Sequence, residues 1–68
     1  MPSTAIREFA YDGQVGTLEV TFVSGRRYRY FLVPDHVAQD FAAASSKGGF
    51  FNAEIRDRYP FQELSRAR

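Results

Sequence analysis

The 68-residue sequence has no cysteine and only one histidine. It can therefore form neither disulfide bonds nor a thiolate metal site. No apolar run approaches the roughly 18 residues of a membrane-spanning helix, and no signal peptide opens the chain. The net charge of +1 is far from the strongly basic balance of a dedicated nucleic-acid-binding domain. These absences predict a cytoplasmic protein, or a domain shared with larger chains, that uses no metal, no cofactor and no membrane.

Aromatic residues are what the chain does have, with seven Phe and four Tyr. Such large side chains can build the core of a small domain. At this length the chain is close to the lower limit at which an apolar core is stable without disulfides or metals. No repeat or linker divides it. We expect one domain over residues 1–68, with an ordered core from about 4 to 61 and a frayed tail at 62–68.

Residues 5–11 are predicted to form the first strand, because Phe9 and Tyr11 alternate on one face. Ile6 falls on the opposite face in a regular strand. A bulge near Arg7 and Glu8 would bring Ile6 back to the core side.

Residues 15–23 give the clearest strand, and the loop after it decides where two tyrosines face. A two-residue loop would turn Tyr28 and Tyr30 away from the apolar row of this strand. A three-residue loop over 23–25, with Gly25 left-handed, pairs Tyr28 with Val20 and Tyr30 with Leu18. The second register also sets Glu19 opposite Arg29, and we adopt it.

Two helices follow the strands. The first is predicted over residues 34–44, with Pro34 in the first helical position and Asp35 in the first turn. Ser45 or Ser46 then caps a second helix that runs to about Arg58. Its apolar stripe consists of Gly48, Phe51, Ile55 and Tyr59. The expected fold is α+β, a three-stranded antiparallel meander followed by two helices packed on one face of the sheet.

Several short motifs follow one another along the chain: Tyr28-Arg29-Tyr30, Val33-Pro34, Ser46-Lys47-Gly48, Phe51-Asn52, Ile55-Arg56 and Tyr59-Pro60. Their order and spacing together resemble the KTSC domain family. This family is named for the C-terminal domain of some lysyl-tRNA synthetases, and it also occurs as small stand-alone bacterial proteins. The resemblance runs from the first strand to Phe61 and implies a fold and an RNA-related setting, because the family has no established activity. Ser45 departs from the family where proline is expected, and Ala53 and Glu54 depart from it where basic or His residues are expected. The positive charge missing at Ala53 and Glu54 counts against nucleic-acid binding.

Catalysis has little support in the sequence. His36 is the only histidine, and Asp40 one turn further along could orient it. No serine or cysteine lies close in sequence to act as a nucleophile. We therefore expect a surface histidine and no enzyme.

RNA binding has two possible sites. Arg26, Arg27 and Arg29 lie on the hairpin beside Tyr28 and Tyr30, and such a hairpin could stack bases and neutralise phosphates. Alternatively, the start of the second helix at residues 45–49 could hold a phosphate, although its glycines could instead allow close packing. The candidate binding residues are Ser46, Lys47, Gly48, Asn52, Arg56, Tyr28, Arg27 and Arg29.

Asn52 and Arg56 have a structural alternative, in which they satisfy backbone groups and cover a strand end. A protein-interaction module is the other function to consider, because Phe31 and Phe50 are predicted to face outward. We expect a small non-catalytic macromolecule-binding domain, a monomer or weak homodimer, with RNA favoured slightly over a protein partner.

Overall fold

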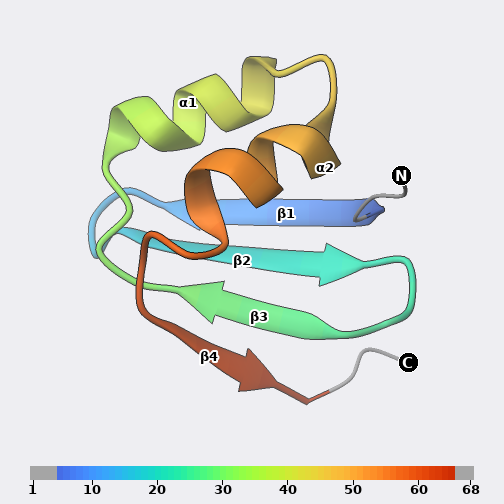
Figure 1. The fold of residues 1–68 in the computed structure, drawn as a ribbon. Coiled ribbons are helices and arrows are strands. Elements are labelled where there is room, and N and C mark those ends of the chain that lie inside the picture. Colours follow the sequence, from blue (N-terminus) through green and yellow to red (C-terminus); the bar gives the residue numbers. More distant parts are fainter. Residues whose placement is uncertain (1–4, 66–68) are drawn as a thin grey trace.

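The computed structural model describes residues 5–65, which form a sheet covered on one face by helical segments (Figure 1). The sheet is antiparallel, with its four strands in the order β1-β2-β3-β4. In chain order the elements are β1 (Ile6–Asp12), β2 (Thr17–Phe22), β3 (Arg27–Tyr30), α1 (Asp35–Ala43), α2 (Lys47–Phe50), the π-helical segment η1 (Phe51–Ile55) and β4 (Phe61–Leu64). The α+β class and the helices on one face are as predicted, whereas the expectation of three strands is wrong by one.

The hairpin between β2 and β3 has the predicted register. Tyr28 pairs with Val20 and Tyr30 with Leu18. The loop is closed by a hydrogen bond of 2.9 Å from the Gly25 N–H to the Phe22 carbonyl, and Gly25 has a φ of 94°. Glycine suits this position because a Cβ is disfavoured at positive φ.

The predicted bulge in β1 is also confirmed. The pairing of β1 with β2 shifts between Ile6 and Glu8. This extra residue returns the Ile6 side chain to the core side, where it is half-buried against the core.

The fourth strand replaces part of the tail that was expected to fray. Phe61 pairs with Tyr30 and Glu63 with Tyr28, at the open edge of β3. A hydrogen bond of 2.9 Å from the Phe31 N–H to the Pro60 carbonyl joins the two strands where β4 begins. Backbone pairing with β3 therefore orders residues 62–64, although apolar and polar side chains do not alternate along this segment. Residues 66–68 of the expected tail lie outside the described residues.

The helices begin as expected, within one residue, but the second has an irregular end. Pro34 is the N-cap of α1 with an extended backbone, one position before the predicted one. Ser46 caps α2, because its side chain accepts a hydrogen bond from the Gly49 N–H at 3.1 Å. The chain then widens into η1, where the Arg56 N–H bonds to the Phe51 carbonyl five residues back. The α-helix therefore ends at Phe50 and the π-helical segment at Ile55, rather than near Arg58.

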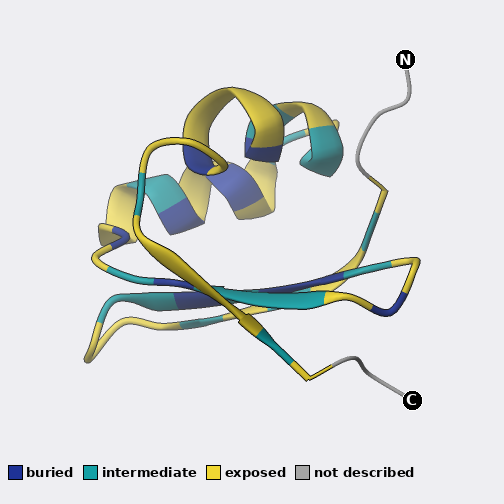
Figure 2. Cartoon of the chain, turned by 60° about the horizontal axis from the view of Figure 1, so that its bottom comes forward, coloured by how far each residue is buried: buried dark blue, intermediate teal, exposed yellow. Residues whose placement is uncertain are grey.

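The core lies in the seam between the sheet and the helices (Figure 2). Phe41 from α1 and both Phe51 and Ile55 from η1 meet the inner face of the sheet. The ring of Phe50 lies 5.8 Å from that of Phe41. Phe50 therefore packs between the helices, and the prediction that it faces outward is wrong. The buried core cluster is Leu18, Val20, Tyr30, Val33, Phe41, Phe51 and Ile55.

Candidate functional site

A groove of about 460 Å³ opens on the helix-bearing face of the sheet, beside β4. It lies between the end of η1 on one side and strands β3 and β4 on the other. We call it the aromatic groove, because five of its nine lining residues are Phe or Tyr. The lining residues are Phe22, Arg26, Tyr28, Tyr30, Phe51, Arg56, Asp57, Phe61 and Glu63.

Three rings from neighbouring strands form the open part of the groove. Phe61 of β4 lies opposite Tyr30 of β3, and their ring centroids are 5.4 Å apart. The centroid of Tyr28 is 5.7 Å from that of Phe61. Phe61 is 55% exposed, whereas Tyr30 is 3% exposed. The groove therefore offers one accessible ring held beside two tyrosines.

Aromatic side chains of the core pack against the same two tyrosines. The ring of Phe51 lies 5.4 Å from both Tyr30 and Phe22, with its plane nearly perpendicular to each. Phe22 in turn meets Tyr28 edge to face at 5.6 Å. Such edge-to-face contacts favour one ring orientation over others. The floor of the groove is therefore a continuation of the packed core.

Charged side chains of both signs surround the rings. Arg26 lies 3.5 Å from the Glu63 carboxylate in an ion pair whose two side chains are each about half exposed. The Arg56 guanidinium lies 3.4 Å from the Asn52 side-chain oxygen, to which it donates a hydrogen bond, and Asp57 follows it in the chain. The groove thus carries two cationic and two anionic side chains.

Tyr30 keeps its proton far above neutral pH. Burial raises its pKa to about 12, and the neighbouring Tyr28 adds to this effect. Arg56 acts in the opposite direction, by favouring the phenolate. At neutral pH the Tyr30 hydroxyl is therefore a neutral hydrogen-bonding group at the base of the groove.

The residues predicted at the start of the second helix lie outside this groove and are engaged locally. The Ser46 hydroxyl oxygen accepts from the Gly49 N–H, and the Lys47 ammonium donates to the Ala44 carbonyl at 2.7 Å. Gly48 is half-buried in the same turn. The Lys47 contact links α2 to the end of α1, and the Ser46 contact caps α2 itself, so the hydroxyl and the ammonium both have structural partners.

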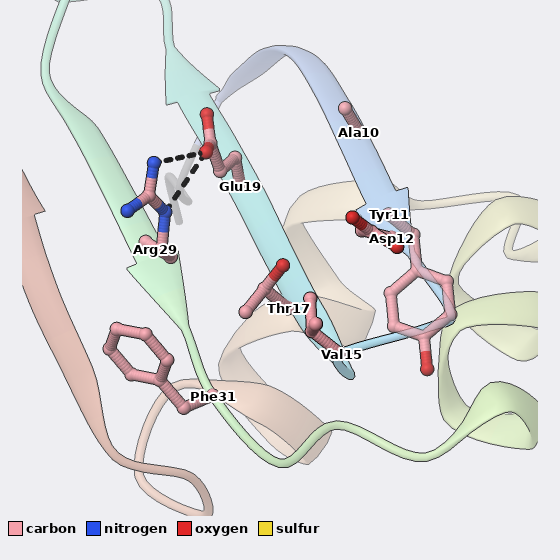
Figure 3. A pocket seen from close by; sticks show the side chains of 8 residues that line it. All are labelled: Ala10, Tyr11, Asp12, Val15, Thr17, Glu19, Arg29 and Phe31. Carbon is pink, nitrogen blue, oxygen red and sulfur yellow. Dashed lines mark hydrogen bonds and ion pairs between the residues drawn. The ribbon is translucent and has the colours of Figure 1, made fainter.

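The predicted arginines of β3 lie on the other face of the sheet from the tyrosines. Arg29 donates two hydrogen bonds to Glu19, at 3.0 and 2.7 Å, across the outer face (Figure 3). Arg27 alternates with Tyr28 and lines a different hollow, beside Glu8 and Thr21. The pleat therefore separates Arg27 and Arg29 from the tyrosines with which they alternate in sequence.

Of the candidate residues, the groove brings together Tyr28 and Arg56, with Asn52 in contact with Arg56. The sequence predicts Arg26 beside the tyrosines of the hairpin, but it places neither Phe61 nor Glu63 there. A signal for Phe61 existed, because an aromatic residue directly after Tyr59-Pro60 is placed to return to the sheet. Its pairing with β3 was not visible in the residue pattern.

Features that would indicate other functions are sparse in residues 5–65. His36 and Asp40 are both exposed on α1. Within the described part of the chain, no three His, Cys, Asp or Glu side chains gather into a group that could hold a metal ion. No helix within the same residues is long and apolar enough to span a membrane.

Comparison with known proteins gives a consistent picture. The sequence profile of the KTSC domain matches residues 2–59. A lysine–tRNA ligase of Nostoc punctiforme is 40% identical over 62 residues, which cover 91% of this chain and 11% of the ligase. An uncharacterised protein of Stutzerimonas stutzeri is 37% identical, with 87% of this chain and 83% of that protein covered. The crystal structure of a KTSC domain protein from Yersinia pestis superposes with a TM-score of 0.87 at 31% identity, covering 96% of this chain and 92% of that one.

Proposed function

The chain belongs to the KTSC domain family, and we propose that it is a non-catalytic binding domain that holds an unpaired segment of RNA in the aromatic groove. The observation that carries this proposal is the exposed ring of Phe61. It stands beside Tyr28 and Tyr30 on a sheet surface next to two arginines.

Stacking is the interaction that these rings are suited to make. Unpaired bases stack on aromatic side chains displayed by a sheet, and each such contact contributes about 1–3 kcal/mol. Phe61 can accept a base because more than half of its surface is exposed. The Tyr30 hydroxyl, neutral at physiological pH, can donate to or accept from a base edge or a ribose hydroxyl.

The charges of the groove predict modest affinity. Arg56 can approach a phosphate, because the oxygen to which its guanidinium donates, at 3.4 Å, belongs to the neutral side-chain amide of Asn52. Arg26 is already paired with Glu63, so an incoming phosphate must compete with that carboxylate. Since few phosphates would be neutralised, we expect weak binding with a shallow dependence on salt.

The relatives supply a plausible setting. The name of the Nostoc punctiforme relative is lysine–tRNA ligase, and it carries a segment like this chain. This chain spans about a tenth of that ligase, so the ligase activity stays with the larger protein. A non-catalytic role for this chain is supported by the exposed position of His36. The cytoplasmic location expected from the sequence stays a prediction.

Binding of a fluorescent single-stranded RNA, followed by anisotropy, tests the proposal. Phe61→Ala removes the accessible ring and should weaken binding by about 5-fold to 150-fold, from the stacking contribution above. Phe31→Ala is the matched control, because this half-buried ring lies on the outer face of the sheet. Its affinity for RNA should equal that of the parent.

Two results would contradict the proposal. One is the absence of binding to either single-stranded RNA or a tRNA pool, which would favour a protein partner for the groove. The other is an equal loss of affinity in Phe61→Ala and Phe31→Ala. Urea unfolding of both variants shows whether a loss reflects the groove or the stability of the fold.

A further inference from the structure

The Tyr30 hydroxyl is a polar group on a buried side chain. Only 3% of this residue is exposed, and it lines the aromatic groove. Within residues 5–65 its hydroxyl takes part in no hydrogen bond. Every enclosed polar side-chain atom of the buried and half-buried residues in that range does have a partner. The Tyr30 hydroxyl is therefore not enclosed, and it opens onto the groove.

The hydroxyl of Tyr11 shows the contrast. It donates to the Val33 carbonyl at 2.6 Å and also lies 3.0 Å from the Asp35 carboxylate. Tyr30 has no such partners, and a ligand that covers its hydroxyl excludes bulk water from it. A covered polar group without a hydrogen bond costs binding free energy. The groove therefore favours a ligand that brings a polar atom to this position.

The charges around the hydroxyl favour a neutral group over a phosphate. Besides burial and Tyr28, which raise the pKa of Tyr30, two charges act on its hydroxyl: Arg56 lowers that pKa and Asp57 raises it. A phosphate at the hydroxyl would be attracted by one of these side chains and repelled by the other. The exposed Arg56 side chain can still meet a phosphate away from Tyr30.

The position of Tyr30 in the sheet places its side chain beside a stacked base. Tyr30 and Phe61 lie opposite each other on β3 and β4, with ring centroids 5.4 Å apart and ring planes inclined by 33°. A base that stacks on the exposed Phe61 ring carries its ribose at one edge, outside the stack. A ribose turned towards β3 therefore comes next to the Tyr30 side chain.

Resting on the function proposed above, we propose that the Tyr30 hydroxyl binds a ribose 2′-hydroxyl and thereby makes the aromatic groove select RNA over DNA. Each of the two hydroxyls can donate one hydrogen bond and accept others, so each can serve as the partner of the other. DNA lacks this group and leaves the Tyr30 hydroxyl without a partner from the sugar. One neutral hydrogen bond corresponds to a preference of about 2-fold to 10-fold.

Fluorescence anisotropy tests the proposal with single-stranded RNA and DNA of one sequence built from A and C only. The two oligonucleotides then differ only in their 2′-hydroxyls. The parent should bind the RNA about 2-fold to 10-fold more tightly than the DNA. Tyr30→Phe should lose this preference, with its affinity for DNA unchanged. A 2′-fluoro oligonucleotide, which keeps an RNA-like sugar conformation without the hydroxyl, should bind the parent and Tyr30→Phe equally.

Two further variants serve as controls. Tyr59→Phe removes a hydroxyl from a half-buried ring that does not line the groove, so it should keep the preference for RNA. Phe61→Ala should weaken binding of RNA and DNA by the same factor, because stacking on the ring does not depend on the sugar. The melting temperature of Tyr30→Phe at neutral pH should match that of the parent, since the lost hydroxyl has no hydrogen-bond partner within residues 5–65.

Equal affinity of the parent for RNA and DNA would overturn this proposal. An equal loss of both affinities in Tyr30→Phe would overturn it too, because the hydroxyl would then bind a base edge or a phosphate. A clearly lower melting temperature of Tyr30→Phe would show that the fold itself uses the hydroxyl. In each of these cases weaker binding by Phe61→Ala would leave the groove as the binding site, whereas a parent that binds no RNA would overturn both proposals.

Discussion

The cap of the second helix gives a prediction that can be worked out in detail. The Ser46 hydroxyl oxygen accepts a hydrogen bond of 3.1 Å from the Gly49 N–H. A Cβ on Gly49 would lie 2.9 Å from that same oxygen, which is too close. Gly49→Ala must therefore displace the Ser46 side chain and break the cap.

The two effects of Gly49→Ala on the free energy of unfolding nearly cancel. Losing a serine N-cap costs about 1 kcal/mol. Replacing a helical glycine with alanine returns about 0.5–1 kcal/mol. Gly49→Ala should consequently leave the free energy of unfolding within about 0.5 kcal/mol of the parent, whereas Ser46→Ala alone should lower it by about 1 kcal/mol.

A double-mutant cycle measured by urea unfolding separates the two contributions. In the Gly49→Ala background the cap is already lost, so adding Ser46→Ala should cost almost nothing. The coupling between the two residues should then be about 1 kcal/mol. If Ser46→Ala costs the same in both backgrounds, the hydroxyl does not occupy the position described here, and the Gly49 N–H would be free for another ligand.

Three further predictions concern the hairpin, the groove and α1. Gly25→Val should destabilise the fold by about 1–3 kcal/mol in urea unfolding, because Gly25 has a φ of 94°; a midpoint equal to that of the parent would refute the three-residue loop. Burial raises the pKa of Tyr30 from 10.0 to about 12, so the contribution of Tyr30 to folding stability should be full below pH 10 and should be lost as the pH rises towards 12. The free energy of unfolding of Tyr30→Phe should therefore fall less over that pH interval than that of the parent. An equal fall in the variant and the parent would contradict this role of Tyr30. His36→Ala should alter neither stability nor RNA affinity by more than about 0.5 kcal/mol, and a larger effect would reopen a catalytic role for this exposed side chain.

Local patterns predicted those parts of the fold that depend on local chemistry. Gly25 fixed the register of the hairpin, because only one loop length placed both tyrosines on the apolar side. Ile6 indicated the bulge, since a regular strand would have left it on the wrong face. Ser46 indicated the start of the second helix through its side-chain chemistry.

The features that sequence reasoning missed depend on distant partners. β4 forms because β3 has an open edge, and its side chains do not alternate in a strand-like way. The π-helical segment buries both Phe51 and Ile55, and helical periodicity alone does not predict a π-helix there. Since the aromatic groove requires β4, its open ring at Phe61 could not be assigned before that strand was known.

An NMR titration with short single-stranded RNA tests most directly whether the aromatic groove binds unpaired RNA. The largest chemical-shift changes should fall on Tyr28, Tyr30 and Phe61, with the side chain of Arg56 also affected. Changes confined to residues 47–52 would instead locate a phosphate at the start of the second helix. A spectrum unchanged by RNA at high concentration would contradict the account.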